Sequence, residues 1–235
     1  MRIGIDLDGT LADLASAWRA IDERLFGPRG TASVATQDER DADEAATPTT
    51  GATRLAGERA EQRRRLEVWR AIRSTPDFWT TLEPLEPGVV RRLHTVALER
   101  RWEVFFLTQR PATAGDTVQR QTQRWLVAQG FDQPSVLTLT GSRGAAAAAL
   151  YLDVLVDDLP RNCLDVVAES RCRPFLVLPK PDEATAASAR RLDVTVVSSV
   201  GEAIDRLQEP EAVGGRTRSR RPVLSLAALF GRGGE

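Results

Sequence analysis

Two aspartates, separated by one residue, follow the first apolar segment of the chain. The segment RIGI leads directly into Asp6 and Asp8, and the adjacent Gly9 allows a sharp turn. If RIGI is a strand, alternate residues at its carboxyl end can point into one crevice, which is where open α/β sheets bind ligands. Two carboxylates this close together are stabilised by a bound cation. The same pattern would also fit an acidic turn or a calcium-binding loop.

Two later apolar segments also end in polar residues. Thr108 follows FFL, and Asp157 and Asp158 follow VLV. Each of these taken alone has an ordinary explanation, because a threonine can cap a helix and two aspartates can form a turn before Pro160. Three strand ends that all carry groups able to hold a metal and a phosphate are harder to explain in that way. We therefore expect the three strand ends to form one site for a cation and a phosphate group.

Short apolar segments alternate with amphipathic stretches along most of the chain. Most of these segments are continuous apolar runs, as in strands that are buried on both faces. The alternation predicts an α/β fold with a mostly parallel, Rossmann-like sheet that is flanked by helices. The predicted strands are 2–6, 103–107, 135–139, 154–156, 174–178 and 194–197. The predicted helices begin near Val89 and then cover about 113–129, 143–150, 160–170, 183–191 and 201–207.

Residues 12–84 interrupt this alternation and are expected to form a small helical insert after the first strand. Apolar residues recur at helical spacing as far as Leu25, and again over 58–73. Between these two helices, 31–57 contains an acidic run and few apolar residues, so we expect a mobile loop there. The residues expected to face inward from the second helix are Leu66, Trp69 and Ile72.

The remaining residues divide into a core and a tail. Residues 1–11 and 85–208 contain all the predicted strands and the polar strand ends, so they form the predicted catalytic core. Residues 209–235 are rich in Gly and Arg and are expected to form a disordered tail. A short motif that docks on a protein partner is the alternative interpretation of this tail.

Composition excludes several classes of protein. The formal net charge of −1 gives no reason to expect nucleic acid or an anionic membrane as a partner. No signal peptide precedes the first strand, and no apolar run is long enough to cross a bilayer, so we expect a cytoplasmic protein. His94 is the only histidine, and Cys163 and Cys172 lack metal-ligand spacing. Chemistry based on histidine or on a cysteine–metal centre is therefore not expected.

The ordered motifs DLDGT, FLTQR and VLVDD resemble those of the haloacid dehalogenase superfamily, and the helical insert resembles that family's cap domain. The resemblance covers about residues 1–207. It implies that Asp6 is the nucleophile and that Asp8, an acid found in the phosphatases of the family but not in its dehalogenases, is the general acid. It also implies a Mg²⁺ ion held by Asp6, the Asp8 carbonyl and Asp157. Asp158 would bind the ion through water or orient the first ligands.

The resemblance assigns two further groups to the phosphate. Thr108 would donate its hydroxyl proton to a phosphoryl oxygen. The family's third motif normally provides a lysine, and the matching stretch TLTGSRGAAAA provides Arg143. Lys180 is the only lysine of the chain, and a guanidinium can bind phosphate through two donors. We therefore expect Arg143 to be the phosphate-binding cation; a surface arginine at a helix start is the alternative.

The segment DFWTTLEPLEPG resembles that of the 5'(3')-deoxyribonucleotidases, although Leu14 stands where that group usually has an aromatic residue. The similarity implies that Phe78 and Trp79 face a nucleobase, with which aromatic rings can stack. The alternative is that the two rings attach the cap to the core. Gln109 and Arg110 would also bind the substrate, and Arg110 could bind phosphate or close the crevice.

The resulting hypothesis is a Mg²⁺-dependent phosphomonoesterase that acts on a small phosphorylated substrate, by resemblance a nucleoside 5'- or 3'-monophosphate. One alternative is a phosphatase of another small ester or of nucleic-acid 3' ends. The acidic run and the neutral overall charge argue against a nucleic-acid substrate. A non-catalytic phosphate-binding or scaffold protein is the other alternative, and the intact acidic motifs argue against it.

Overall fold

A six-stranded parallel sheet forms the centre of the computed structural model, which describes residues 1–28, 51–180 and 183–209. The strand order is β3-β2-β1-β4-β5-β6. The chain adds β2 and β3 on one side of β1 and then crosses to the other side, so the topological switch point lies between β1 and β4. The predicted α/β fold is confirmed. The strands are β1 (Arg2–Asp6), β2 (Glu103–Thr108), β3 (Ser135–Thr138), β4 (Val154–Asp157), β5 (Arg173–Val177) and β6 (Thr195–Val197).

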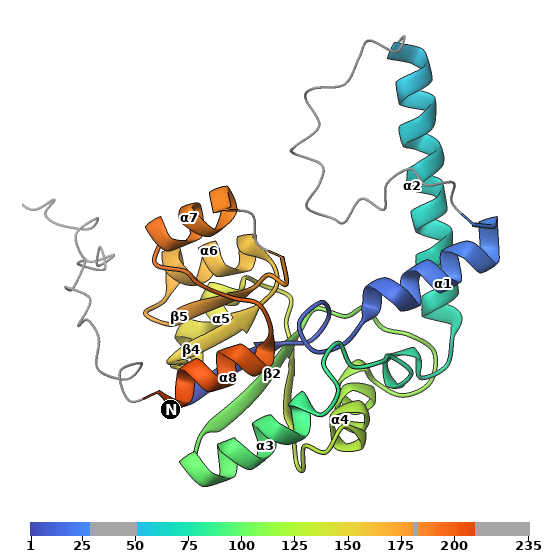
Figure 1. Ribbon diagram of the computed structural model, residues 1–235. Helices are drawn as coiled ribbons and strands as arrows, with labels where there is room; N and C mark the ends of the chain where they lie inside the picture. The colour runs from blue at the N-terminus through green and yellow to red at the C-terminus, as the bar shows by residue number, and fades with distance from the viewer. Residues whose placement is uncertain (29–50, 181–182, 210–235) are drawn as a thin grey trace, which may run out of the picture.

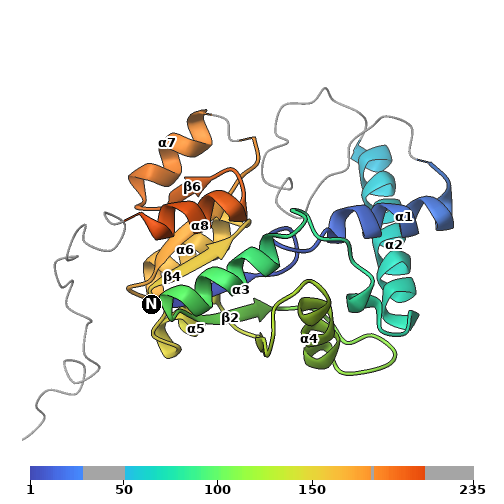
Figure 2. The same ribbon diagram turned by 60° about the horizontal axis from the view of Figure 1, so that its bottom comes forward.

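Helices cover both faces of this sheet (Figures 1 and 2). α3 (Val89–Arg100) and α8 (Val200–Gln208) pack on one face, and α5 (Arg143–Ala149) and α6 (Pro160–Glu169) pack on the other. α4 (Val118–Ala128) contacts β3, and α7 (Glu183–Arg191) contacts β6. The predicted helix 113–129 begins later than expected, because Thr117 caps it by accepting a hydrogen bond from the Arg120 amide.

The alternation of side chains along β1 determines where its last residue points. Ile3 and Ile5 belong to the apolar cluster under α3 and α8, whereas Gly4 lies against Leu152 and Leu155 on the opposite face. Because side chains alternate between faces, Asp6 points to the same side as Gly4, which is the side of α5. Ile5 is paired with Val156 of β4, so Asp6 and Asp157 are level at the carboxyl edge of the sheet.

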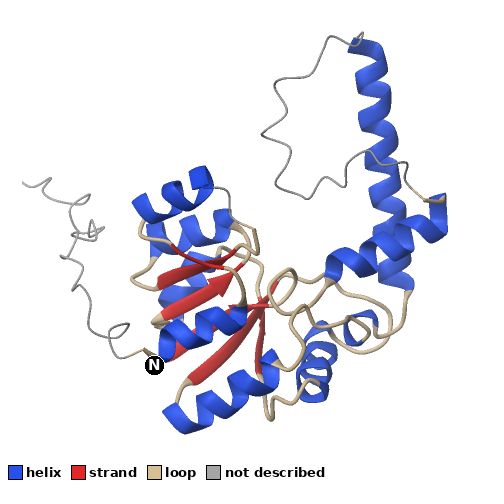
Figure 3. Ribbon diagram, viewed as in Figure 1, coloured by secondary structure: helices blue, strands red, loops and turns tan. Residues whose placement is uncertain are grey.

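Two helices project beyond the carboxyl end of β1 (Figures 1 and 3). They are α1 (Leu14–Phe26) and α2 (Gly51–Ser74), and a 3₁₀ turn, η2 (Phe78–Thr80), follows them. Trp18 and Trp69 meet edge to face with their ring centroids 4.9 Å apart. Asp22 is buried and accepts a hydrogen bond of 2.7 Å from Arg64 Nη2. These contacts join the two helices into a small cap.

The cap differs from the sequence prediction in two respects. α2 begins at Gly51, so the stretch 51–57, which was expected to be part of the loop, is helical. The expected inward orientation of Leu66 is wrong: this side chain is 58% exposed, whereas Val68 and Ile72 are fully buried. α2 packs against α1 along one side only, so only one stripe of its residues is covered. The rest of the predicted loop, 31–50, and the predicted tail beyond residue 209 lie outside the described residues.

No helix in the described part of the chain combines sufficient length with sufficient apolarity to cross a bilayer.

Candidate active site

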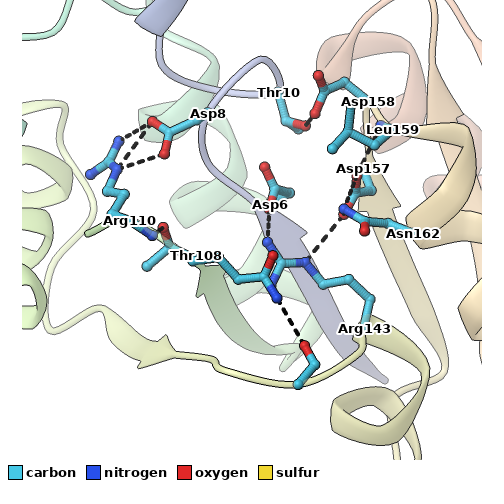
Figure 4. Close-up of polar contacts among 12 residues, drawn as sticks. Asp6, Asp8, Thr10, Thr108, Arg110, Arg143, Asp157, Asp158, Leu159 and Asn162 are labelled. Atoms are coloured by element: carbon cyan, nitrogen blue, oxygen red, sulfur yellow. Dashed lines mark hydrogen bonds and ion pairs between the residues drawn. The ribbon is translucent and has the colours of Figure 1, made fainter. Parts of the chain in front are cut away.

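Asp6 and Arg143 form a buried ion pair at the carboxyl edge of the sheet (Figure 4). Asp6 is 5% exposed, and its carboxylate accepts a hydrogen bond from Arg143 Nη2. Arg143 Nε lies 3.4 Å from the carboxylate of Asp157. The guanidinium therefore lies between two of the four predicted acidic residues of the site. The alternative interpretation of Arg143 as a surface residue is wrong, because its side chain is 4% exposed.

The start of α5 places Arg143 in this position. Ser142 caps the helix by accepting a hydrogen bond of 3.0 Å from the Ala145 amide. The next residue, Gly144, packs directly on α6, where an added Cβ would lie 2.2 Å from the backbone oxygen of Asp165. Only glycine permits this close approach. The packing of α5 on α6 thus fixes the helix start from which the Arg143 side chain extends.

One nitrogen of Arg143 lacks a partner. Nη1 is the only buried side-chain nitrogen or oxygen without a hydrogen bond among the described residues. A buried donor that stays unpaired costs about 1–3 kcal/mol, so such an atom indicates a missing acceptor. It belongs to a guanidinium that already contacts the carboxylate expected to attack a phosphoryl group. An anionic oxygen bound beside Asp6 would satisfy it.

Asp157 is held by the Leu159 amide and by Asn162, neither of which belongs to a predicted motif. Its carboxylate accepts hydrogen bonds from the Leu159 amide at 2.9 Å and from Asn162 Nδ2 at 2.9 and 3.0 Å. Asn162 belongs to the first turn of α6, which begins at Pro160. Its place one turn after the VLVDD motif is the only sequence signal that could have identified it. These donors fix the orientation of an acidic side chain that is fully buried.

Asp158 lies against the loop that follows β1. Its carboxylate accepts a hydrogen bond of 3.1 Å from Thr10 Oγ1. Gly9 has a φ of +90°, and a Cβ at this position would lie 2.1 Å from Asp158 Oδ2. The glycine of the DLDGT motif therefore serves both the left-handed turn and the close approach of Asp158.

Burial raises the proton affinity of Asp6, Asp157 and Asp158, and neighbouring carboxylates raise that of Asp6 and Asp158 further. Burial is the main cause that raises the pKa of Asp6 well above the usual range of an aspartate, and the charge of Asp157 adds to it, whereas Arg143 acts in the opposite direction. Burial also raises the pKa of Asp157. Burial and then the neighbouring Asp157 raise the pKa of Asp158 to about 7. Three carboxylates share a single nearby guanidinium, so the ionised cluster has an excess of negative charge.

A divalent cation fits this cluster in charge and in donor type. Mg²⁺ prefers carboxylate and carbonyl oxygens, and the excess charge of the ionised cluster is that of two electrons. As the described side chains are placed, no group of three or more acidic, histidine or cysteine side chains is already arranged around a metal position. The oxygens of Asp6 and Asp157 instead contact Arg143 and Asn162.

Thr108 and Gln109 follow β2 at the same edge. Thr108 is buried, and its Oγ1 accepts a hydrogen bond of 3.2 Å from the Arg110 amide, which leaves its own proton available for donation. Gln109 is exposed, and its Nε2 donates to the carbonyl of Gly141 at 2.9 Å. Gln109 thus links the loop after β2 to the loop before α5. A substrate contact for Gln109 stays a prediction.

Arg110 does not extend toward Asp6 or the phosphate position. Its side chain is fully buried, and it forms a two-pronged ion pair with Asp8, with Nη2 2.7 Å and Nε 2.9 Å from the carboxylate oxygens (Figure 4). Nη1 donates to Thr122 Oγ1 at 3.0 Å. Both sequence-based roles of Arg110, binding phosphate and closing the crevice, are therefore replaced by a contact with the predicted general acid.

Phe78 and Trp79 lie in the protein core rather than at an open surface. Phe78 is 4% exposed and Trp79 is fully buried. The Trp79 ring stacks on the Arg110 guanidinium at 4.8 Å, and its Nε1 donates to the Pro111 carbonyl at 3.0 Å. Neither ring is available to stack on a base in this structure. The alternative interpretation, that the pair attaches the cap to the core, agrees with these contacts.

Comparison with known proteins shows a similarity of fold and nothing finer. No family model matches the sequence, and no curated protein matches it. Similar solved structures do exist. One is a candidate β-phosphoglucomutase from Thermotoga maritima, with a TM-score of 0.50 and 16% identity over 89% of this chain and 99% of that chain. Another is a haloacid dehalogenase-like hydrolase from Streptococcus pneumoniae, with a TM-score of 0.50 and 11% identity over 88% and 98%.

Both matches span almost the full length of the neighbouring proteins. At sequence identities this low, the two matches establish a similarity of fold and not of activity. The chain therefore has the fold of the haloacid dehalogenase-like hydrolases.

Proposed function

We propose that the protein is a Mg²⁺-dependent phosphomonoesterase that acts through an aspartyl-phosphate on Asp6. The observation that carries the proposal is the buried guanidinium of Arg143, which contacts Asp6 and Asp157 and keeps one donor unpaired. A phosphoryl oxygen at this donor would bring the phosphorus next to the Asp6 carboxylate. Such a site holds the electrophile and the nucleophile together, which is the main requirement of phosphoryl transfer.

The proposed reaction has two steps. In the first, an Asp6 oxygen forms a bond to phosphorus while the bond from phosphorus to the ester oxygen breaks, and Asp8 gives its proton to the departing alkoxide. In the second, Asp8 accepts a proton from a water molecule, the water oxygen bonds to phosphorus, and the bond from Asp6 to phosphorus breaks. Arg143 and the hydroxyl of Thr108 would hold phosphoryl oxygens throughout.

The cation belongs to the same proposal. Asp6, Asp157 and the Asp8 carbonyl would hold Mg²⁺, and Asp158 would bind it through water or orient the other ligands. When bound, the ion neutralises charge on the phosphoryl oxygens and on the acidic cluster. Its presence would also favour ionised Asp6, whose proton affinity is raised by burial, and only the ionised carboxylate can act as a nucleophile.

The substrate class is defined only in part by these residues. A small phosphate ester fits the proposal. A nucleoside monophosphate is the finer prediction. Phe78 and Trp79 are buried and offer no surface to a base in this structure, so this prediction rests on the resemblance of DFWTTLEPLEPG. A nucleic-acid 3' end is the alternative within the same chemistry.

A phosphate-release assay tests the proposal. The panel contains mononucleotides, sugar phosphates, p-nitrophenyl phosphate and an oligonucleotide with a 3' phosphate, each with Mg²⁺ or with EDTA. We expect turnover that requires Mg²⁺ and that is lost in Asp6→Asn, while Asp132→Asn, a change of an exposed aspartate, keeps it. Circular dichroism confirms that both variants fold. The absence of release from every ester, or full activity of Asp6→Asn, would refute the proposed function.

A further inference from the structure

Three different groups contact the guanidinium of Arg110. One edge, Nε and Nη2, faces the two oxygens of Asp8, and the remaining nitrogen, Nη1, donates to Thr122. The face of the group lies on the Trp79 ring. Five donors in a rigid plane define one orientation when three different partners engage them. The position of the Arg110 guanidinium is therefore fixed by the protein and not by a ligand.

The partners of Arg110 are themselves held in place. The Trp79 amide donates to Gln121 Oε1 at 3.1 Å, and the indole Nε1 donates to the Pro111 carbonyl. Gln121 and Thr122 are fully buried residues of α4. The contacts thus run from the turn after the cap, through α4, to Arg110 and on to Asp8. They connect a rigid part of the core with the loop that follows β1.

The two oxygens of Asp8 are not used equally. Oδ1 accepts from both Nε, at 3.0 Å, and Nη2, at 2.7 Å, whereas Oδ2 accepts only from Nε, at 2.9 Å. Oδ2 is thus the less engaged oxygen, and it keeps more room for a further partner. Asp8 is also the less buried partner, with its side chain 19% exposed against none for Arg110. The carboxylate can therefore reach a ligand on one side while Arg110 holds it on the other.

We infer that Arg110 is the positioning residue for Asp8. The inference rests on the proposed function. As the proton leaves Asp8 Oδ2 and bonds to the ester oxygen, the carboxylate becomes negative, and Arg110 is already placed to stabilise that charge. Arg110 thereby acts on leaving-group protonation and not on phosphate binding. Trp79 and Thr122 maintain its orientation.

Two esters with different leaving groups separate this role from a purely structural one. Ethyl phosphate releases an alkoxide, which needs a proton, whereas p-nitrophenyl phosphate releases a stable phenolate, which does not. In Arg110→Met we expect kcat on ethyl phosphate to fall about 100-fold, the lower range for general acid catalysis. On p-nitrophenyl phosphate we expect a loss of a few-fold at most, with KM unchanged for both esters. Arg120→Met, which removes an exposed arginine of α4, is the matched control.

A double-mutant cycle makes the test sharper. If Arg110 acts through Asp8, Arg110→Met adds no further loss on ethyl phosphate once Asp8→Asn is present. Thr122→Val removes one contact of Arg110 while keeping the charge and the shape of the site. It should cause a smaller loss that is again confined to ethyl phosphate, and it carries the test if Arg110→Met does not fold.

The outcomes are distinguishable. Equal losses on the two esters, or a raised KM with unchanged kcat, would overturn the positioning role while leaving the proposed function in place. Additive losses in the cycle would do the same. A wild-type protein that releases phosphate neither from these two esters nor from any other ester of the panel would overturn the proposed function and this inference together.

Discussion

Replacement of Gly144 by alanine tests whether the packing of α5 on α6 positions Arg143. The new Cβ would lie 2.2 Å from the Asp165 oxygen and 2.6 Å from its carbonyl carbon, whereas ordinary contact begins at 3.4 Å. Because the obstructing atoms belong to the backbone of α6, α5 and α6 must separate by roughly 1 Å at this point. Protein interiors are too closely packed to absorb such a separation without cost. Overpacking of this kind costs about 1–3 kcal/mol.

The same displacement should affect the proposed chemistry. Arg143 precedes Gly144 directly, and a misplacement of about 1 Å can reduce turnover about 100-fold. We therefore expect Gly144→Ala to lower Tm by about 5 °C, which corresponds to about 2 kcal/mol for a chain of this size. We also expect kcat/KM to fall, by up to about 100-fold. Thermal unfolding and Mg²⁺-dependent phosphate release measure the two effects.

Gly57→Ala is the matched control, because Gly57 lies in α2 with nothing within 4 Å of an added Cβ. Alanine favours a helix over glycine by about 1 kcal/mol, so this variant should be slightly more stable and fully active. Wild-type stability of Gly144→Ala would refute the close approach of the helices. Lowered stability with unchanged kcat/KM would refute the role given to Arg143.

Three further predictions concern the acidic cluster. Arg143→Ala leaves the buried carboxylates of Asp6 and Asp157 without the guanidinium, so in EDTA it should lower the free energy of unfolding by about 3–5 kcal/mol. In urea unfolding, Mg²⁺ should restore part of this loss. An equal loss with and without Mg²⁺ would contradict a cation site there. Gly9→Ala should destabilise the protein and weaken its stabilisation by Mg²⁺, because a Cβ would meet Asp158. Gly27 also has a positive φ, but it has open space around it, so Gly27→Ala should show only the backbone effect in thermal unfolding. The pKa of Asp158 is raised to about 7, above its value in the unfolded chain, so its contribution to metal-free stability is present at low pH and is lost as pH rises through 7. Mg²⁺ binds the ionised form, so the rise in Tm on adding Mg²⁺ should grow between about pH 5 and 8, and a rise that is independent of pH would contradict this.

The strands and the positions of the acidic groups could be predicted because the signals are local. Continuous apolar segments mark strands buried on both faces, and the polar residue at each end lies at the carboxyl edge of a parallel sheet. The structure accordingly places Asp6, Thr108 and Asp157 at that edge, and the start of α5 adds Arg143. Strand bounds agree within one residue, because hydrophobicity changes abruptly at their ends.

The contacts of Arg110 and Trp79 could not be predicted, because they depend on distant parts of the chain. Arg110 meets Asp8 across 102 positions, and Trp79 meets Pro111 across 32. Residue type alone indicates that an arginine near a phosphate site binds phosphate and that an aromatic pair faces a base. Both Arg110 and Trp79 are instead buried in the structure. Their burial follows from the packing of α4 against the turn after the cap. Asn162 was missed for a related reason, since an asparagine in a helix has no distinctive pattern.

Trapping of the covalent intermediate tests the central proposal most directly. The protein is mixed with p-nitrophenyl phosphate and Mg²⁺ and then treated with borohydride, which reduces an aspartyl-phosphate to the corresponding alcohol and releases phosphate. Peptide mass spectrometry then locates the altered residue. We expect homoserine at position 6, formed only when substrate is present. An unaltered Asp6 under turnover, or an altered aspartate at any other position, would contradict the account.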